Sequence, residues 1–211
     1  MEEMSDNVPP PGAAVTDGRL LRGARSRRAI TRHAVDIASL EGLNGLSLGR
    51  LATDLGLSKS GVQTLFKTKE NLYLATVEAA RELFLDAVVR PAQAAPPGAA
   101  RVRALIDHWI DYAEKPLFTG GCFWAANLPD FDSRPGPVRD ALAGQHQDWL
   151  SLISAQLRHA LNAGEIASID PDLAAFQADA VLNATNTALR LGDRDAPGRA
   201  RRVIDGFLTR P

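Results

Sequence analysis

Hydrophobic and polar positions alternate with a helical period along the N-terminal third of the chain. Gly42 and Gly56 follow two of the periodic segments at positions where glycine commonly ends a helix. Ser47 and Ser58 each precede an apolar stripe, as helix N-cap residues do. The pattern predicts helices over residues 25–41, 48–55, 58–65 and 68–89.

The rest of the chain keeps the same period and contains no strand pattern. A loop rich in helix breakers covers 91–99, and Asp170 before Pro171 marks a helix start. Five further helices are predicted, over about 102–115, 122–127, 138–163, 171–191 and 197–208. The sequence therefore predicts an all-α protein of about nine helices.

Charge is distributed unevenly, although the whole chain has a formal net charge of −1. Residues 19–69 hold ten Lys and Arg against three Asp and Glu, so the remainder is acidic. A basic segment on an acidic body indicates a surface for a polyanion, and a solvated charged surface is the alternative interpretation. The N-terminal residues show no apolar signal segment, and no apolar run is long enough to span a membrane, so we expect a cytoplasmic protein.

The segment 47–66, SLGRLATDLGLSKSGVQTLF, has the pattern of a helix-turn-helix. Gly56 and Leu57 form a tight turn, which allows the second helix to project into the major groove of DNA. The exposed side chains of that helix are short or flexible hydrogen-bonding groups. An ordinary helical hairpin is the alternative. We expect DNA contacts from Ser47, Arg50, Ser58, Lys59, Ser60, Gln63, Thr64, Lys67 and Lys69.

Residues at fixed spacing over 30–72 carry a resemblance to a known family: Ile30, Ala34, Ala38, Gly42, Ser47, Leu51, Ala52, Gly56, Leu57, Ser58, Gly61, Phe66, Lys69, Glu70 and Leu72. With these residues, the segment resembles the DNA-binding domain of TetR/AcrR-family transcriptional regulators. The resemblance implies that Lys69 contacts a DNA phosphate. The chain departs from the family at Gln63 and Leu65, where many members have aromatic residues, so no base preference is carried over. Residues 120–142 also resemble the C-terminal domain of one subgroup.

The expected organisation is a disordered tail over 1–20, a three-helix helix-turn-helix domain over 21–68, and a helical bundle over 69–211. The bundle is expected to bind a ligand and to dimerise. The resulting hypothesis is a homodimeric repressor, which a small apolar ligand releases from a near-palindromic operator on double-stranded DNA. The alternative is a helical ligand-binding or enzymatic domain whose N-terminal third docks a protein partner.

Bulky aromatic residues are concentrated in the middle of the chain, next to a Gly- and Pro-rich connection. They indicate a mainly apolar ligand pocket, and simple core packing is the alternative. The expected pocket residues are Trp109, Phe123, Trp124, Asn127, Trp149, His108 and His146. An apolar stripe near the C-terminus indicates a dimer interface with Leu191, Val203, Ile204, Phe207 and Leu208.

No catalytic or nucleotide-binding motif occurs in the sequence, and the four histidines lack metal-ligand spacing. We therefore expect no enzymatic activity, no cofactor and no metal site. Cys122 is the single cysteine and cannot form an internal disulfide. We interpret it as a small buried hydrophobe, with a redox sensor as the alternative.

Overall fold

The computed structural model describes residues 11–210, and every regular element in that range is a helix. The expected all-α architecture with about nine helices is confirmed. The longer helices are α1 (Pro11–Glu41), α2 (Leu48–Asp54), α3 (Lys59–Phe66), α4 (Lys69–Phe84), α6 (Ala99–Glu114), α7 (Phe123–Phe131), α8 (Pro137–Asn162), α9 (Pro171–Arg190) and α10 (Ala196–Phe207). The short elements are the 3₁₀ turn η1 (Leu43–Gly45), the π-helical turn η2 (Leu85–Val89) and α5 (Arg90–Ala92).

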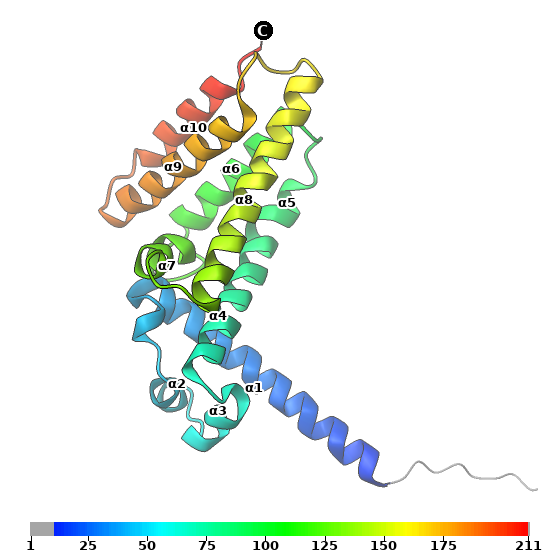
Figure 1. Ribbon diagram of the computed structural model, residues 1–211, viewed down its shortest axis with the longest axis vertical. Helices are drawn as coiled ribbons and strands as arrows, with labels where there is room; N and C mark the ends of the chain where they lie inside the picture. The colour runs from blue at the N-terminus through cyan, green and yellow to red at the C-terminus, as the bar shows by residue number, and fades with distance from the viewer. Residues whose placement is uncertain (1–10, 211) are drawn as a thin grey trace, which may run out of the picture.

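Helices α1 to α3 form one end of an elongated molecule, and α4 to α10 form the body above them (Figure 1). The long helix α8 runs along the body and packs against α4, α6, α7 and α9. Helices α9 and α10 lie side by side at the far end from α2 and α3. Helix α4 joins the two parts, because it packs on α1 at its beginning and on α8 in the body.

The expected disordered tail over 1–20 is wrong from Pro11 onward, because α1 begins there. Residues 1–10 lie outside the described part of the chain. A proline is tolerated in the first turn of a helix, and the Ala, Leu and Arg residues that follow are good helix formers. Leu20 and Leu21 are 66% and 61% exposed, and the N-terminal half of α1 projects away from the body (Figure 1).

Two helix ends differ from the sequence prediction. Helix α4 passes into η2 before it reaches Val89, so its last turn is wider than an α-helical turn. Helix α7 continues beyond Asn127 to Phe131, whose buried ring meets Tyr73 edge-on at 6.2 Å between centroids. Packing of Phe131 thus extends the helix past Pro129. Among the described helices, none is long and apolar enough to cross a membrane.

Candidate nucleic-acid interface and candidate ligand cavity

Helices α2 and α3 form the predicted helix-turn-helix, and local sequence determines where each begins. The Ser47 hydroxyl accepts a hydrogen bond from the Arg50 N–H, and the Ser58 hydroxyl accepts one from the Gly61 N–H, both at 3.1 Å. Each serine thereby satisfies a backbone donor that has no partner within its helix. Gly56 turns the chain between the helices with φ +63°, a conformation that costs other residues more. Both predicted N-caps are confirmed.

The inner face of α3 packs against α2 and α4, and Arg27 of α1 adds further contacts. Val62 and Phe66 are each 1% exposed. The Arg27 guanidinium of α1 lies 4.7 Å from the centre of the Phe66 ring and donates a hydrogen bond to the Leu65 carbonyl at 2.9 Å. Because these contacts hold one side of α3, they also determine which side faces outward.

The outward face of α3 carries Lys59, Ser60, Gln63 and Thr64, and all four side chains are exposed. The Thr64 hydroxyl donates to the Ser60 carbonyl at 2.8 Å, and the Gln63 amide donates to the Lys67 carbonyl. Gln63 keeps its amide oxygen and one N–H for an outside partner, and Thr64 keeps its oxygen as an acceptor. This face can therefore both donate to and accept from base edges in a major groove.

Arg50 forms ion pairs within the protein, whereas Lys59, the cation of α3, is exposed. Its guanidinium meets the two carboxylate oxygens of Glu41 at 2.5 and 2.7 Å, and a carboxylate oxygen of Asp54 lies 3.8 Å away. The hydrogen bonds lower the pKa of Glu41 and raise the pKa of Arg50. The structure thus uses this predicted DNA-contacting residue to tie α2 to the end of α1, because the fork of Arg matches a carboxylate.

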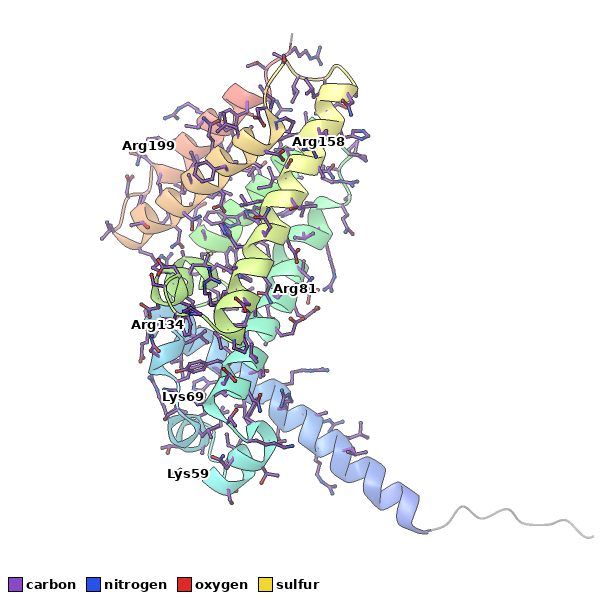
Figure 2. The ribbon with its side chains drawn as sticks, viewed as in Figure 1. Lys59, Lys69, Arg81, Arg134, Arg158 and Arg199 are labelled. Atoms are coloured by element: carbon purple, nitrogen blue, oxygen red, sulfur yellow. The ribbon has the colours of Figure 1, made fainter. Side chains whose placement is uncertain are left out.

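The turn between α3 and α4 presents two further lysines. Lys67 has φ +63°, the one positive φ outside glycine among the described residues. Lys69 is the first residue of α4, and its ammonium lies 5.3 Å from the centre of the Tyr73 ring. Lys69 and Arg134 line a groove of about 300 Å³. Figure 2 shows Lys59, Lys69 and Arg134 following one another along this end of the molecule.

A cavity of about 150 Å³ lies in the body, between α4 with η2, α6, α7, α8 and α9. Phe84 of α4 packs edge-on against two tryptophans of its wall, at 5.2 Å from Trp124 and 5.4 Å from Trp149. The aromatic cluster in the sequence therefore surrounds a space rather than a solid core. Part of the predicted pocket set lines this space: Trp109, Trp124, His146 and Trp149.

The remaining predicted pocket residues lie elsewhere. Phe123 is fully buried in the core, and His108 is half-buried away from the cavity wall. Asn127 is also fully buried, and its oxygen accepts a hydrogen bond from the Leu43 N–H at 2.7 Å. Its amide N–H groups donate to the carbonyls of Ala38 and Phe123 at 3.1 and 2.7 Å. Asn127 thus ties α7 to the end of α1 instead of anchoring a ligand.

Polar residues of the cavity wall come from helices far apart in the sequence. The His146 imidazole lies 2.9 Å from the Asp179 carboxylate, and the Asn183 amide donates to that carboxylate at 3.0 Å. The hydrogen bond to Asp179 raises the pKa of His146. Sequence reasoning missed Asp179, Asn183 and Gln145, since no local motif connects α8 with α9.

The connection between α6 and α7 packs directly against α1. The Asp36 carboxylate accepts hydrogen bonds from the backbone N–H and the hydroxyl of Thr119 at 2.7 and 2.8 Å. A Cβ atom added to Gly120 would lie 2.0 Å from the Ser39 carbonyl oxygen, so only glycine fits this approach. Cys122, two residues later, lines the cavity. The cavity wall is therefore continuous with a contact to the helix-turn-helix end.

A family model described as the tetracycline repressor-like C-terminal domain matches residues 98–204, just over half of the chain. The chain belongs to the TetR family. It is therefore a DNA-binding transcriptional regulator and not an enzyme. The matched region begins next to α6 and ends within α10, so it contains most of the cavity wall.

Solved structures share the TetR-family fold. A TetR transcriptional regulator from Chloroflexus aurantiacus J-10-FL has a TM-score of 0.81 and 21% identity, with 88% of this chain and 95% of that chain covered. A TetR-family regulator from Agrobacterium tumefaciens has a TM-score of 0.79 and 15% identity, covering 89% and 100%. AibR, solved with isovaleryl coenzyme A and operator DNA, has a TM-score of 0.72 and 19% identity, covering 88% and 100%. No curated protein matches the sequence.

The C-terminal helices of this TetR-family chain divide the predicted dimer residues into two groups. Leu191 and Val203 are 83% and 42% exposed, whereas Phe207 is half-buried. Ile204 and Leu208 are only 2% and 4% exposed, so the structure moves them from the predicted interface to the core. They turn inward because α10 packs on α6 and α9 within the same subunit.

Cys122 is buried among aromatic residues at the cavity wall. Burial raises the pKa of its thiol, which disfavours the reactive thiolate. The environment therefore fits the interpretation of a small buried hydrophobe better than that of a redox sensor. Within residues 11–210, no group of three or more His, Cys, Asp and Glu is placed to hold a metal ion.

Proposed function

We propose that this TetR-family regulator is a homodimeric repressor of the cytoplasm, released from a near-palindromic operator by a small, mainly apolar ligand. Residues 21–68 serve as the DNA-binding domain and residues 69–211 as the ligand-binding and dimerisation domain. The observation that carries the proposal is α3, because its inner face is locked by Val62 and Phe66 while its outer face is polar and exposed. Such a helix can enter a major groove without rearrangement.

The proposed DNA contacts are of two kinds, those to phosphates and those to base edges. Lys67 and Lys69 neutralise phosphates, which gives affinity without sequence information. Lys59, Gln63 and Thr64 read base edges from the outward face of α3. Ser47 and Ser58 complete the phosphate contacts, because an N-capping hydroxyl that accepts a backbone N–H still has its own O–H to donate. Ser60 is exposed within α3 with its hydroxyl 3.4 Å from the Ser58 hydroxyl, and it is the third serine proposed at the phosphates.

The dimer is proposed to form through the outward sides of α9 and α10. Leu173 and Phe176 of α9 are 54% and 63% exposed, and Leu191 follows on the same side of the helix. Val203 of α10 adds a further exposed apolar residue. A second copy of the chain would bury these residues in a four-helix bundle. Two-fold symmetry then places the two α3 helices about one helical turn of DNA apart.

Ligand binding is proposed to act on the DNA-binding end along two structural connections. Helix α4 starts at Lys69 and reaches the cavity at Phe84 and η2, a kind of turn that is frequent at functional sites. The α6–α7 connection runs from the cavity at Cys122 to α1 at Gly120. A ligand shifts the dimer only by its different affinities for the DNA-bound and released arrangements.

The proposal is tested by footprinting the full chain on the DNA upstream of its own gene. We expect protection of two half-sites with centres about 10 base pairs, or one helical turn, apart. Phe176→Glu should yield monomers in sedimentation and lose the footprint, because it places a charge in the proposed interface. Leu40→Glu is the matched control, since Leu40 is equally exposed on α1 at 62%. Absence of any protected site at low salt, or a dimer that survives Phe176→Glu, would contradict the proposal.

A further inference from the structure

Among the described residues, four buried side-chain polar atoms have no hydrogen-bond partner, and three of them belong to residues of the cavity wall, the fourth being the Tyr73 hydroxyl. The indole N–H groups of Trp124 and Trp149 are buried, and neither has a hydrogen-bond partner among the described residues. The side-chain oxygen of Gln145 is likewise buried without a hydrogen-bond partner among the described residues. A buried polar group without a partner costs free energy, so native structures rarely keep one without a reason. Because three residues of one cavity wall carry such groups, we infer that a bound molecule supplies the partners.

The orientation of the Gln145 amide follows from its other contact. Its amide nitrogen lies 3.5 Å from a carboxylate oxygen of Glu78, and a carboxylate only accepts hydrogen bonds. The amide oxygen therefore takes the buried position at the cavity. The wall offers two donors, from Trp124 and Trp149, and one acceptor, from Gln145. A single hydroxyl group matches this set, because its oxygen accepts two hydrogen bonds and its proton makes one.

The volume of the cavity fits a ligand of about one ring. This volume is about 150 Å³. An engineered apolar cavity of about this volume in another protein binds benzene. In so small a space, groups on different sides of the wall reach the same bound molecule. Aromatic walls from Phe84 and the tryptophans favour a flat ring over a flexible chain.

The charges of the wall favour a neutral molecule. Arg81 is flanked by Glu78 and Glu82 at 3.6 and 3.7 Å. The carboxylate of Asp179 is matched by His146 and Asn183, and Asp148 adds another acidic side chain to the lining. The cavity thus holds no surplus of positive charge that would stabilise a carboxylate or phosphate on the ligand.

We propose that the effector is a neutral single-ring compound with a hydroxyl group, of the phenol class. Its oxygen accepts hydrogen bonds from the indole N–H groups of Trp124 and Trp149, and its O–H donates to the side-chain oxygen of Gln145. This inference rests on the proposed function, because it assumes that the cavity holds the effector. It adds the chemistry by which that effector is selected.

Titration calorimetry of the full chain with phenol and toluene tests the ligand class. The two molecules have the same shape, and phenol is neutral at pH 7 because its pKa is about 10. We expect phenol to bind about tenfold more tightly, or better, because only its hydroxyl satisfies the buried groups. Benzoate, which is anionic at this pH, should bind more weakly than phenol. Equal or tighter binding of toluene or benzoate would overturn the inference, as would the absence of phenol binding.

Variants connect the preference to the proposed atoms. Trp149→Phe removes one N–H and Gln145→Met removes the acceptor, and each should reduce the ratio of phenol to toluene affinity several-fold. Gln147→Met is the matched control for Gln145→Met, because Gln147 lies on the same helix but is exposed and does not line the cavity. It should keep the parent ratio. A ratio unchanged in Gln145→Met, which alters a partly exposed residue, would overturn the inference even if Trp149→Phe did not fold.

Operator release separates this inference from the proposed function. Phenol should release a footprinted operator fragment over the concentration range in which it fills the cavity. Selective phenol binding without release would leave the ligand chemistry standing and contradict the effector role. Release by toluene at least as effective as by phenol would leave the effector role standing and overturn the ligand chemistry.

Discussion

The helix-turn-helix and the cavity satisfy their polar groups in opposite ways. In α2 and α3, polar groups find partners a few residues away, as Ser58 does with Gly61, and then face water. In the cavity, the indole N–H groups of Trp124 and Trp149 are buried and find no partner among the described residues. The first surface is complete before a partner arrives, whereas the second becomes complete only with one. This difference supports the proposals that the preformed face binds DNA and that the uncompensated interior binds the effector.

The largest effect on stability is expected at the contact between these two regions, where Gly120 packs against α1. Gly120→Val would force side-chain atoms against the Ser39 carbonyl, where even a Cβ lies at 2.0 Å. We expect the free energy of unfolding to fall by about 3 kcal/mol, measured by urea titration. Gly144→Ala is the control, because Gly144 lies within α8 and an added Cβ meets nothing within 4 Å. It should leave stability unchanged or raise it, and equal losses in both variants would disprove the tight junction.

A smaller loss is expected from Asn127→Ala, which removes the side-chain tie between α7 and the end of α1. The variant leaves the buried Leu43 N–H without a partner and removes one of the two hydrogen bonds that the Ala38 carbonyl accepts, at a cost of about 2 kcal/mol. Asn44→Ala is the comparison variant, because Asn44 is exposed and bonds only surface groups of Asp130 and Arg134. Its effect should stay within about 0.5 kcal/mol. Similar stability of the two variants would show that Asn127 is not a structural tie.

The phosphate contact of the DNA-binding face is tested by Lys69→Ala. We expect weaker binding to specific and random DNA alike, with the slope of log K against log salt reduced by about one unit. Arg158→Ala changes the net charge equally at the opposite end of the molecule, as Figure 2 shows, and should leave the slope unchanged. Fluorescence anisotropy across a salt series measures both variants. An unchanged slope for Lys69→Ala would remove this lysine from the interface.

The smallest effect concerns pH and the polar wall of the cavity. Because Asp179 raises the folded-state pKa of His146, the pair stabilises the fold fully below the ordinary histidine pKa of 6.5. That contribution is lost as pH rises through the raised folded-state pKa. The stability difference between the parent and His146→Phe should therefore be largest at pH 5.5 and should shrink on the alkaline side. Urea titrations from pH 5.5 to 8.5 measure it, and a difference that grows with pH would contradict the assignment.

Local sequence predicts the helix-turn-helix end well, because its determinants lie within a few residues of each other. The caps at Ser47 and Ser58 and the turn at Gly56 are examples, and each is found where the pattern places it. The pairing of Arg50 with Glu41 is not predictable from local sequence, because it depends on how α2 packs against α1. The sequence does not predict the start of α1 at Pro11, because the proline and glycine residues there are also typical of a disordered tail.

The cavity is predicted only in part, because its wall is a product of tertiary packing. The aromatic cluster indicated the region, and Trp109, Trp124 and Trp149 do line the space. Asn127 was misassigned because a buried amide has the same sequence signature whether it binds a ligand or a neighbouring helix. Ile204 was misassigned for a similar reason, since an apolar stripe can be buried inside a subunit as well as between two subunits.

The proposed DNA-binding function depends on α3 reading the DNA sequence through its outward face. The most direct measurement compares the affinities of the parent and of the variant Lys59→Ala/Gln63→Ala/Thr64→Ala for the footprinted operator and for random DNA of equal length. We expect the variant to keep its fold and to bind random DNA only modestly more weakly, while its preference for the operator falls by tenfold or more, about 1.4 kcal/mol. An operator preference equal to that of the parent would show that these side chains do not read the DNA sequence.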